Sequence, residues 1–81
     1  MQAAIEQKLQ ALSPIHLEVK DFSDGCGKKF DVFIVSDVFD GKPLLERHRM
    51  VNSALSEEIS EIHALTMKTW TRPQWNSFMK N

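Results

Sequence analysis

The stretch KFDVFIVSDVFDGKPLLERHRMVNSALS, residues 29–56, decides the fold of this chain. Its first part, from Lys29 to Val35, places apolar side chains on both faces of an extended segment, which predicts a strand that is central in a sheet or covered on both sides. Pro43 then suits the first turn of a helix, where its missing N–H is not needed. Apolar residues recur after it at helical spacing and predict the longest helix, over about residues 43–56. The apolar stripe of this helix consists of Leu44, Leu45, His48, Val51, Ala54 and Leu55.

On the N-terminal side, a short helix and a strand precede the central strand. Apolar residues in 5–12 recur at helical spacing, which is typical of an amphipathic helix, and Pro14 disfavours the helical conformation for the residue before it. Residues 15–20 alternate between apolar and polar side chains, which predicts a strand with one wet face. Glycine and aspartate gather in residues 23–27 and predict a tight reversal, so we expect the two strands to form an antiparallel hairpin.

On the C-terminal side, the pattern predicts one more strand and one more helix. Residues 56–61 are polar and have room for a short helical turn, and residues 62–67 read as a third strand. Thr71 and Gln74 have the spacing of a capping box, ahead of a final helix with an apolar face. A right-handed crossover would place the third strand parallel to the second. The sequence therefore predicts a single α+β domain over residues 1–81, of order α-β-β-α-β-α, with a three-stranded mixed sheet and helices packed mainly on one face.

Composition limits the function. Ten Lys and Arg stand against 11 Asp and Glu, and a net charge of -1 gives no global attraction for nucleic acid or an anionic membrane. One cysteine in 81 residues cannot form an internal disulfide or supply a four-cysteine or two-cysteine zinc site. The first residues lack the basic start and apolar core of a secretory peptide, and no apolar run approaches the ~20 residues of a membrane span. We therefore expect a cytoplasmic protein with a reduced thiol.

Cys26 and His63 are the candidate metal ligands. Cys26 lies between two glycines in a predicted turn, just before Lys28 and Lys29, whose charge would favour the thiolate; an incidental surface thiol is the alternative. His63 lies at the start of the third strand, where a structural role and a ligand role are equally open. The two can lie at one end of a mixed sheet, but two ligands leave a four-coordinate site incomplete. Any metal held there would need ligands from another molecule, and thiolate plus imidazole suits iron–sulfur clusters, zinc or copper.

The other two histidines have structural interpretations. His16 lies on the polar face of the first strand and is expected to be solvated. His48 faces the apolar stripe and is expected to pack there with one hydrogen bond. A Cys–His pair could serve as nucleophile and base, but no third orienting group is identified, so the sequence predicts no catalytic residue and no enzyme.

A basic segment, Lys42 together with Arg47-His48-Arg49, is the remaining charge feature. It is either the wet edge of a helix or a surface for a partner's carboxylates or nucleic-acid phosphates. The order of elements is similar to that of KH-type RNA-binding modules, which clamp the backbone with a Gly-x-x-Gly loop. Gly25 is followed three positions later by Lys28 and Gly41 by Leu44, so that loop is missing.

The chain contains the segments FDGKPLLERHRMVN at residues 39–52, EIHAL at 61–65, Lys68-Thr69 and Pro73-Gln74-Trp75. Together these segments resemble the signature of BolA-like proteins, and the resemblance runs over nearly the whole chain. It implies an α/β fold related to the KH type without the Gly-x-x-Gly loop. Family members of the eukaryotic cytosolic type pair with monothiol glutaredoxins and share a bridging [2Fe-2S] cluster, for which the partner and its bound glutathione each supply a cysteine sulfur. Carried over by position, the resemblance implies His63 and Cys26 as this chain's ligands.

The expected function is therefore an iron–sulfur adaptor that serves cluster trafficking or iron sensing, and that binds no cluster alone. Its expected partners are a monothiol glutaredoxin with glutathione, and a second copy of the chain is a further possibility. Lys42, Arg47, His48 and Arg49 are candidate partner-binding residues, and the nucleus is a second candidate compartment. The alternative is a nucleic-acid-binding transcriptional regulator on the KH-like scaffold, and a thiol redox protein acting through Cys26 alone is a third hypothesis.

Overall fold

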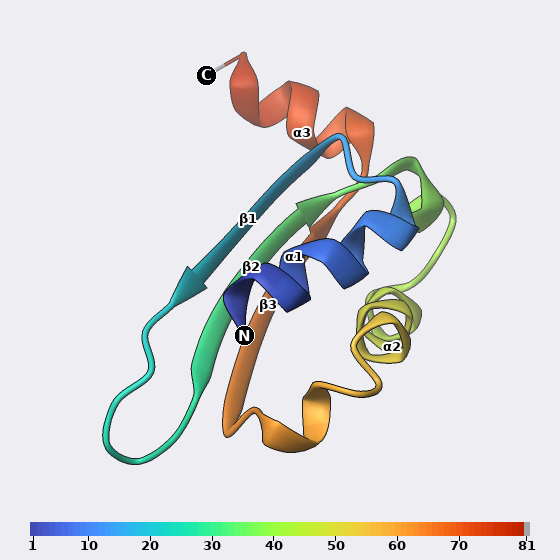
Figure 1. Ribbon diagram of the computed structural model, residues 1–81. Coiled ribbons are helices and arrows are strands. Elements are labelled where there is room, and N and C mark those ends of the chain that lie inside the picture. Colours follow the sequence, from blue (N-terminus) through green and yellow to red (C-terminus); the bar gives the residue numbers. More distant parts are fainter. Residues whose placement is uncertain (81) are drawn as a thin grey trace.

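The computed structural model describes residues 1–80 and confirms the α+β architecture (Figure 1). Short 3-10 turns separate several of the regular elements. The elements in chain order are α1 (Gln2–Leu9), η1 (Gln10–Leu12), β1 (His16–Asp21), β2 (Lys29–Val35), η2 (Asp37–Phe39), α2 (Leu44–Ala54), η3 (Ile59–Glu61), β3 (Ala64–Trp70) and α3 (Arg72–Met79).

The sheet has the order β1-β2-β3, with β2 in the centre as the sequence predicts. β1 runs antiparallel to β2, with His16 opposite Val35, and β3 runs parallel to β2, with Lys29 opposite Ala64. Because parallel strands begin at the same edge, the hairpin loop before β2 and the segment before β3 lie at one end of the sheet. This topology decides which side chains the fold brings together.

Helices cover both faces of the sheet unequally. Alternate side chains of β2, from Phe30 to Ile34, enter the core beneath α1 and α2, which pack on one face (Figure 1). Phe33 points to the other face, where Trp75 of α3 lies against it with ring centroids 5.6 Å apart. Two helices therefore share the main core and α3 covers only the far end of the opposite face. The buried core consists of Ile5, Leu9, Val19, Phe30, Val32, Ile34, Phe39, Val51 and Leu55.

Element boundaries differ from the sequence prediction in three places. The first helix begins earlier, at Gln2, and its last turn tightens into η1, after which Ser13 adopts φ +50° and ends it. The long helix stops at Ala54 instead of residue 56. The sequence predicts the third strand over residues 62–67, whereas the observed strand is Ala64–Trp70, because its ladder follows β2 from Lys29 to Val35. His63 therefore precedes the strand instead of belonging to it.

The predicted capping box is confirmed at the start of α3. The Oε1 atom of Gln74 accepts a hydrogen bond from the backbone N–H of Thr71 at 2.8 Å. This contact satisfies a backbone donor that the helix itself cannot pair. Within residues 1–80, no helix is both long and apolar enough to cross a membrane.

Candidate functional site

The hairpin loop between β1 and β2 is organised around Asp24. One carboxylate oxygen of Asp24 accepts the backbone N–H of Cys26 at 2.8 Å, and the other pairs with Lys29 Nζ at 3.0 Å. The backbone of Asp24 also exchanges two hydrogen bonds of 3.2 Å with Gly27. These contacts fix the turn on both sides of Cys26, which is exposed. The structure therefore confirms the exposed position that the sequence predicts for this cysteine.

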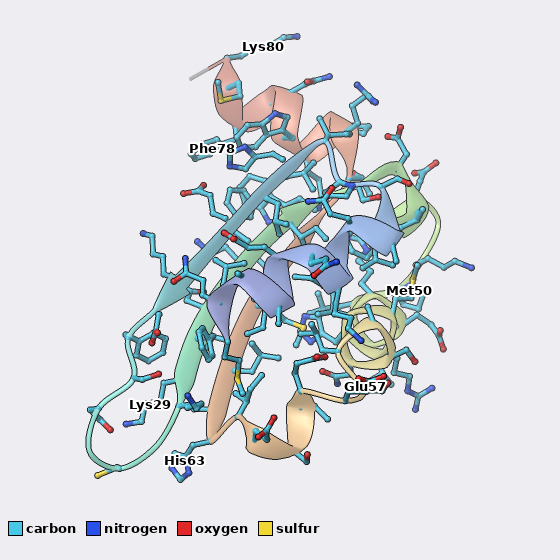
Figure 2. All side chains as sticks on the ribbon, viewed as in Figure 1. Lys29, Met50, Glu57, His63, Phe78 and Lys80 are labelled. Carbon is cyan, nitrogen blue, oxygen red and sulfur yellow. The ribbon has the colours of Figure 1, made fainter. Side chains whose placement is uncertain are left out.

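His63 lies directly against this loop. Its backbone N–H donates to the carbonyl of Lys28 at 2.7 Å, just before the β2–β3 ladder begins. A Cβ placed on Gly27 would lie only 2.9 Å from the Cβ of His63, so the backbone of Gly27 is in close contact with that side chain. Figure 2 shows His63 and Lys29 at the same end of the sheet, opposite the end that carries Phe78. The fold therefore brings the loop that carries Cys26 and the imidazole of His63 to one place.

The charge of Asp24 belongs to the same end of the sheet. The hydrogen bond from the Lys29 side chain has the largest effect on the pKa of the Asp24 carboxyl and lowers it below its ordinary value. The hydrogen bond from the Cys26 backbone N–H lowers this pKa further, and positive charge on His63 acts in the same direction. Asp24 is therefore a carboxylate beside both candidate ligands. The sequence pattern identifies Asp24 only as a turn residue. Its spacing before Cys26, typical of an Asx turn, is the signal that could have identified this role.

Two candidate donors, His63 and Cys26, lie at this end of the sheet. Across residues 1–80, no group of three or more His, Cys, Asp or Glu side chains is arranged to hold a metal ion. His63 and Cys26 offer one imidazole and one thiol, both exposed at an edge of the molecule. Two exposed donors of this kind can complete a four-coordinate site only together with donors from a second molecule.

The basic segment of α2 does not form one uniform surface. Arg47 donates from Nε to the carbonyl of Lys42 at 2.8 Å and from a terminal nitrogen to the carbonyl of Thr69 at 3.0 Å. The same nitrogen reaches Gln74 Oε1 at 3.2 Å. Arg47 therefore joins α2 to β3 and α3. Lys42 and Arg49 are exposed, and Arg49 pairs with Glu46 at 3.3 Å, one turn earlier on the helix.

Two histidines differ from their expected environments. His16 is not simply solvated, because its ring stacks on Trp75 at 4.4 Å and its Nε2 lies 2.8 Å from Glu18. The tertiary position of α3 creates this contact, which strand alternation does not reveal. His48 is half-buried in α2 as expected, but within residues 1–80 nothing forms a hydrogen bond with its buried Nε2. Neither residue lies in the loop that contacts His63.

Asp21 at the end of β1 gives the hairpin a measurable pH dependence. Hydrogen bonding from the Ser23 side chain and from its backbone N–H, at 2.9 Å from Asp21 Oδ1, lowers the pKa of Asp21 below its ordinary value. A lowered carboxyl pKa stabilises the folded state above the unfolded-state pKa, and this contribution is lost as pH falls through the folded value. In an acid titration by NMR, the Ser23 amide should move with a midpoint below that of an ordinary aspartate. Asp21→Asn should remove that transition, and a midpoint at or above the ordinary value would contradict the assignment.

Comparisons with known proteins agree with this fold. The family described as BolA-like protein matches residues 9–74. Protein BOLA2 of Arabidopsis thaliana is 57% identical over 74 residues, covering 91% of this chain and 76% of that protein. The DNA-binding transcriptional regulator BolA of Escherichia coli is 44% identical over 79 residues, covering 88% of this chain and 75% of that protein.

Among solved structures, the crystal structure of a Bol-like protein from Babesia bovis superposes with a TM-score of 0.93 at 44% identity, covering 98% of this chain and 93% of that one. The family match spans most of the chain, including the hairpin loop, α2 and His63. The chain therefore belongs to the BolA-like protein family.

Proposed function

We propose that this protein is a non-enzymatic iron–sulfur adaptor that binds a monothiol glutaredoxin and shares a [2Fe-2S] cluster with it. The observation that carries the proposal is the contact of the Cys26 loop with His63, through Gly27 and the 2.7 Å hydrogen bond from His63 N–H to Lys28 O. An imidazole and a thiol are thereby held at one exposed edge, where a partner can reach both. The remaining two ligands would come from the glutaredoxin cysteine and its bound glutathione.

The chemistry of the donors suits a cluster that is passed on. Imidazole must be neutral to ligate iron, so protons compete with the metal and binding weakens as pH falls. Replacing a thiolate by histidine also raises the reduction potential of a [2Fe-2S] cluster. A cluster held in part by His63 is therefore easier to release than one held by four thiolates, which fits cargo in trafficking or a signal in iron sensing.

Mixing the protein with a [2Fe-2S]-loaded monothiol glutaredoxin tests the proposal. We expect new visible circular dichroism bands that saturate at one chain per glutaredoxin, and a heteromeric species in size-exclusion chromatography with light scattering. The matched control is the same titration with cluster-free glutaredoxin, which should give no visible bands. A cluster spectrum unchanged by excess protein would contradict the proposal.

A second candidate function is nucleic-acid-binding regulation. One observation favours it, namely the relative in Escherichia coli that is described as a DNA-binding transcriptional regulator. The pairing of Arg49 with Glu46 and the internal contacts of Arg47 reduce the free cationic surface of α2. Binding to duplex DNA across a salt series separates the two functions, because phosphate contacts make affinity fall linearly with log salt concentration. A regulator gives that slope, whereas the adaptor is expected to show no measurable affinity.

A further inference from the structure

We infer that Gly27 is a positioning residue, whose missing side chain lets the hairpin loop seat against His63 and set the imidazole relative to Cys26. The inference rests on the proposed function, since it concerns the same pair of ligands. It assigns a role to a residue that donates nothing to a metal. Its basis is the space around Gly27, the anchoring of His63 and the contacts that hold the loop.

The space beside Gly27 is too small for any side chain. A Cβ at this position would lie 2.9 Å from His63 Cβ, 3.2 Å from Cγ and 3.7 Å from Nδ1. Separations below about 3 Å are inside van der Waals contact of two carbon atoms, whose optimum is about 3.5–4.0 Å. The backbone of Gly27 also has φ +141°, a conformation that L-residues rarely adopt. Any substitution must therefore move the loop, the imidazole or both.

Neither side of this contact is free to move without cost. His63 is tied to Lys28 by its backbone hydrogen bond of 2.7 Å, next to the first pair of the β2–β3 ladder. The loop is tied by Asp24, which holds the Cys26 N–H at 2.8 Å and Lys29 Nζ at 3.0 Å. Because both partners are anchored, a methyl group at Gly27 would change the orientation of the His63 ring relative to Cys26.

The loop supplies its own matched control. Gly25 stands on the other side of Cys26, and a Cβ there would meet no atom of residues 1–80 within 4 Å. Gly41 controls for backbone strain, because its φ is +73° and a Cβ there also meets no atom of the described residues within 4 Å. Gly25→Ala therefore changes the same loop without touching His63, and Gly41→Ala imposes strain at a site remote from both ligands.

The experiment compares Gly27→Ala with Gly25→Ala, Gly41→Ala and His63→Ala. Each variant is measured first without metal and then with cluster-loaded glutaredoxin. Ring-nitrogen NMR of the metal-free protein reports the environment of His63, and visible circular dichroism with the rate of cluster loss to a chelator reports ligation. We expect Gly27→Ala to shift the His63 ring resonances and to speed cluster loss on the order of 10-fold, the size typical of residues that orient metal ligands. Gly25→Ala should match the unchanged protein in both readouts, and Gly41→Ala should lower only the melting temperature.

The outcomes separate the inference from the proposed function. Unchanged ring resonances and cluster loss in Gly27→Ala would overturn the positioning role while His63→Ala still tests ligation. A His63→Ala complex identical to the unchanged one would overturn the ligand role of His63 in the proposed function, while the metal-free NMR still reports the Gly27 contact. If Gly27→Ala does not fold, Asp24→Ala loosens the same loop without adding atoms beside His63. Faster cluster loss in Asp24→Ala would support positioning by the loop, and an unchanged rate would contradict it.

Discussion

His63→Ala is expected to alter the visible circular dichroism of the glutaredoxin complex and to speed cluster loss to a chelator by at least about 10-fold. Even residues that only orient a metal ligand change metal affinity by about 10–100-fold, so removing the ligand itself should do no less. The side chain is exposed and its backbone hydrogen bond to Lys28 is retained in alanine, so the fold should persist. Far-ultraviolet circular dichroism and thermal unfolding of the metal-free variant check that point.

His16→Ala is the matched control for this prediction. His16 pairs with Val35 at the opposite end of β2 and stacks on Trp75, so its loss should perturb tryptophan fluorescence and leave the cluster unchanged. Cys26→Ser, measured in parallel, determines whether the thiol is a ligand. If His63→Ala and His16→Ala give the same cluster spectrum and lifetime, the ligand role of His63 is wrong.

Arg47→Ala is expected to lower the free energy of unfolding by about 2–3 kcal/mol. Its guanidinium donates to Lys42 O, Thr69 O and Gln74 Oε1, and hydrogen bonds from charged groups contribute about 1.5–3 kcal/mol each before discounting for solvent. For a domain of this size, that loss corresponds to a melting temperature lower by roughly 10 °C or more. Urea denaturation followed by far-ultraviolet circular dichroism measures it.

Arg49→Ala is the comparison two residues further along α2. Within residues 1–80, the exposed pair with Glu46 is the only contact of this kind that Arg49 makes, and such pairs contribute about 0–1 kcal/mol. Its removal should therefore change stability by less than about 0.5 kcal/mol. A different result would contradict this structural role of Arg47. If the two variants are equally stable and only Arg47→Ala loses glutaredoxin binding, Arg47 is a partner-binding residue, as the sequence suggests.

The fold could be predicted where its signals are local. The two-faced apolar run from Lys29 to Val35, the helix after Pro43 and the Thr71–Gln74 capping box each depend on a few neighbouring residues, and each is confirmed. The predicted apolar stripe of that helix is only partly confirmed, because Val51 and Leu55 are buried whereas Leu44 and Leu45 are exposed. Boundaries were less accurate because they depend on pairing. The third strand extends to Trp70 because β2 continues to Val35 beside it.

The closeness of the Cys26 loop to His63 could be predicted from the sequence, whereas the contacts of Arg47 and His16 could not. Topology alone brings the Cys26 loop and His63 to one end of the sheet, and that juxtaposition followed from strand order. The internal role of Arg47 was missed because two of its acceptors are backbone carbonyls, which leave no trace in side-chain chemistry. The stacking of His16 on Trp75 was missed because it depends on where α3 folds back over the sheet.

The parallel pairing of β2 with β3 has a consequence for how the site comes into being. Gly27 and His63 are brought together only after a long crossover has closed, and the entropy of closing such a loop is repaid only when the whole ladder pairs. A nascent or partly unfolded chain therefore carries Cys26 and His63 as two unrelated side chains. Under the adaptor proposal, only a chain that has completed its sheet presents both candidate ligands together.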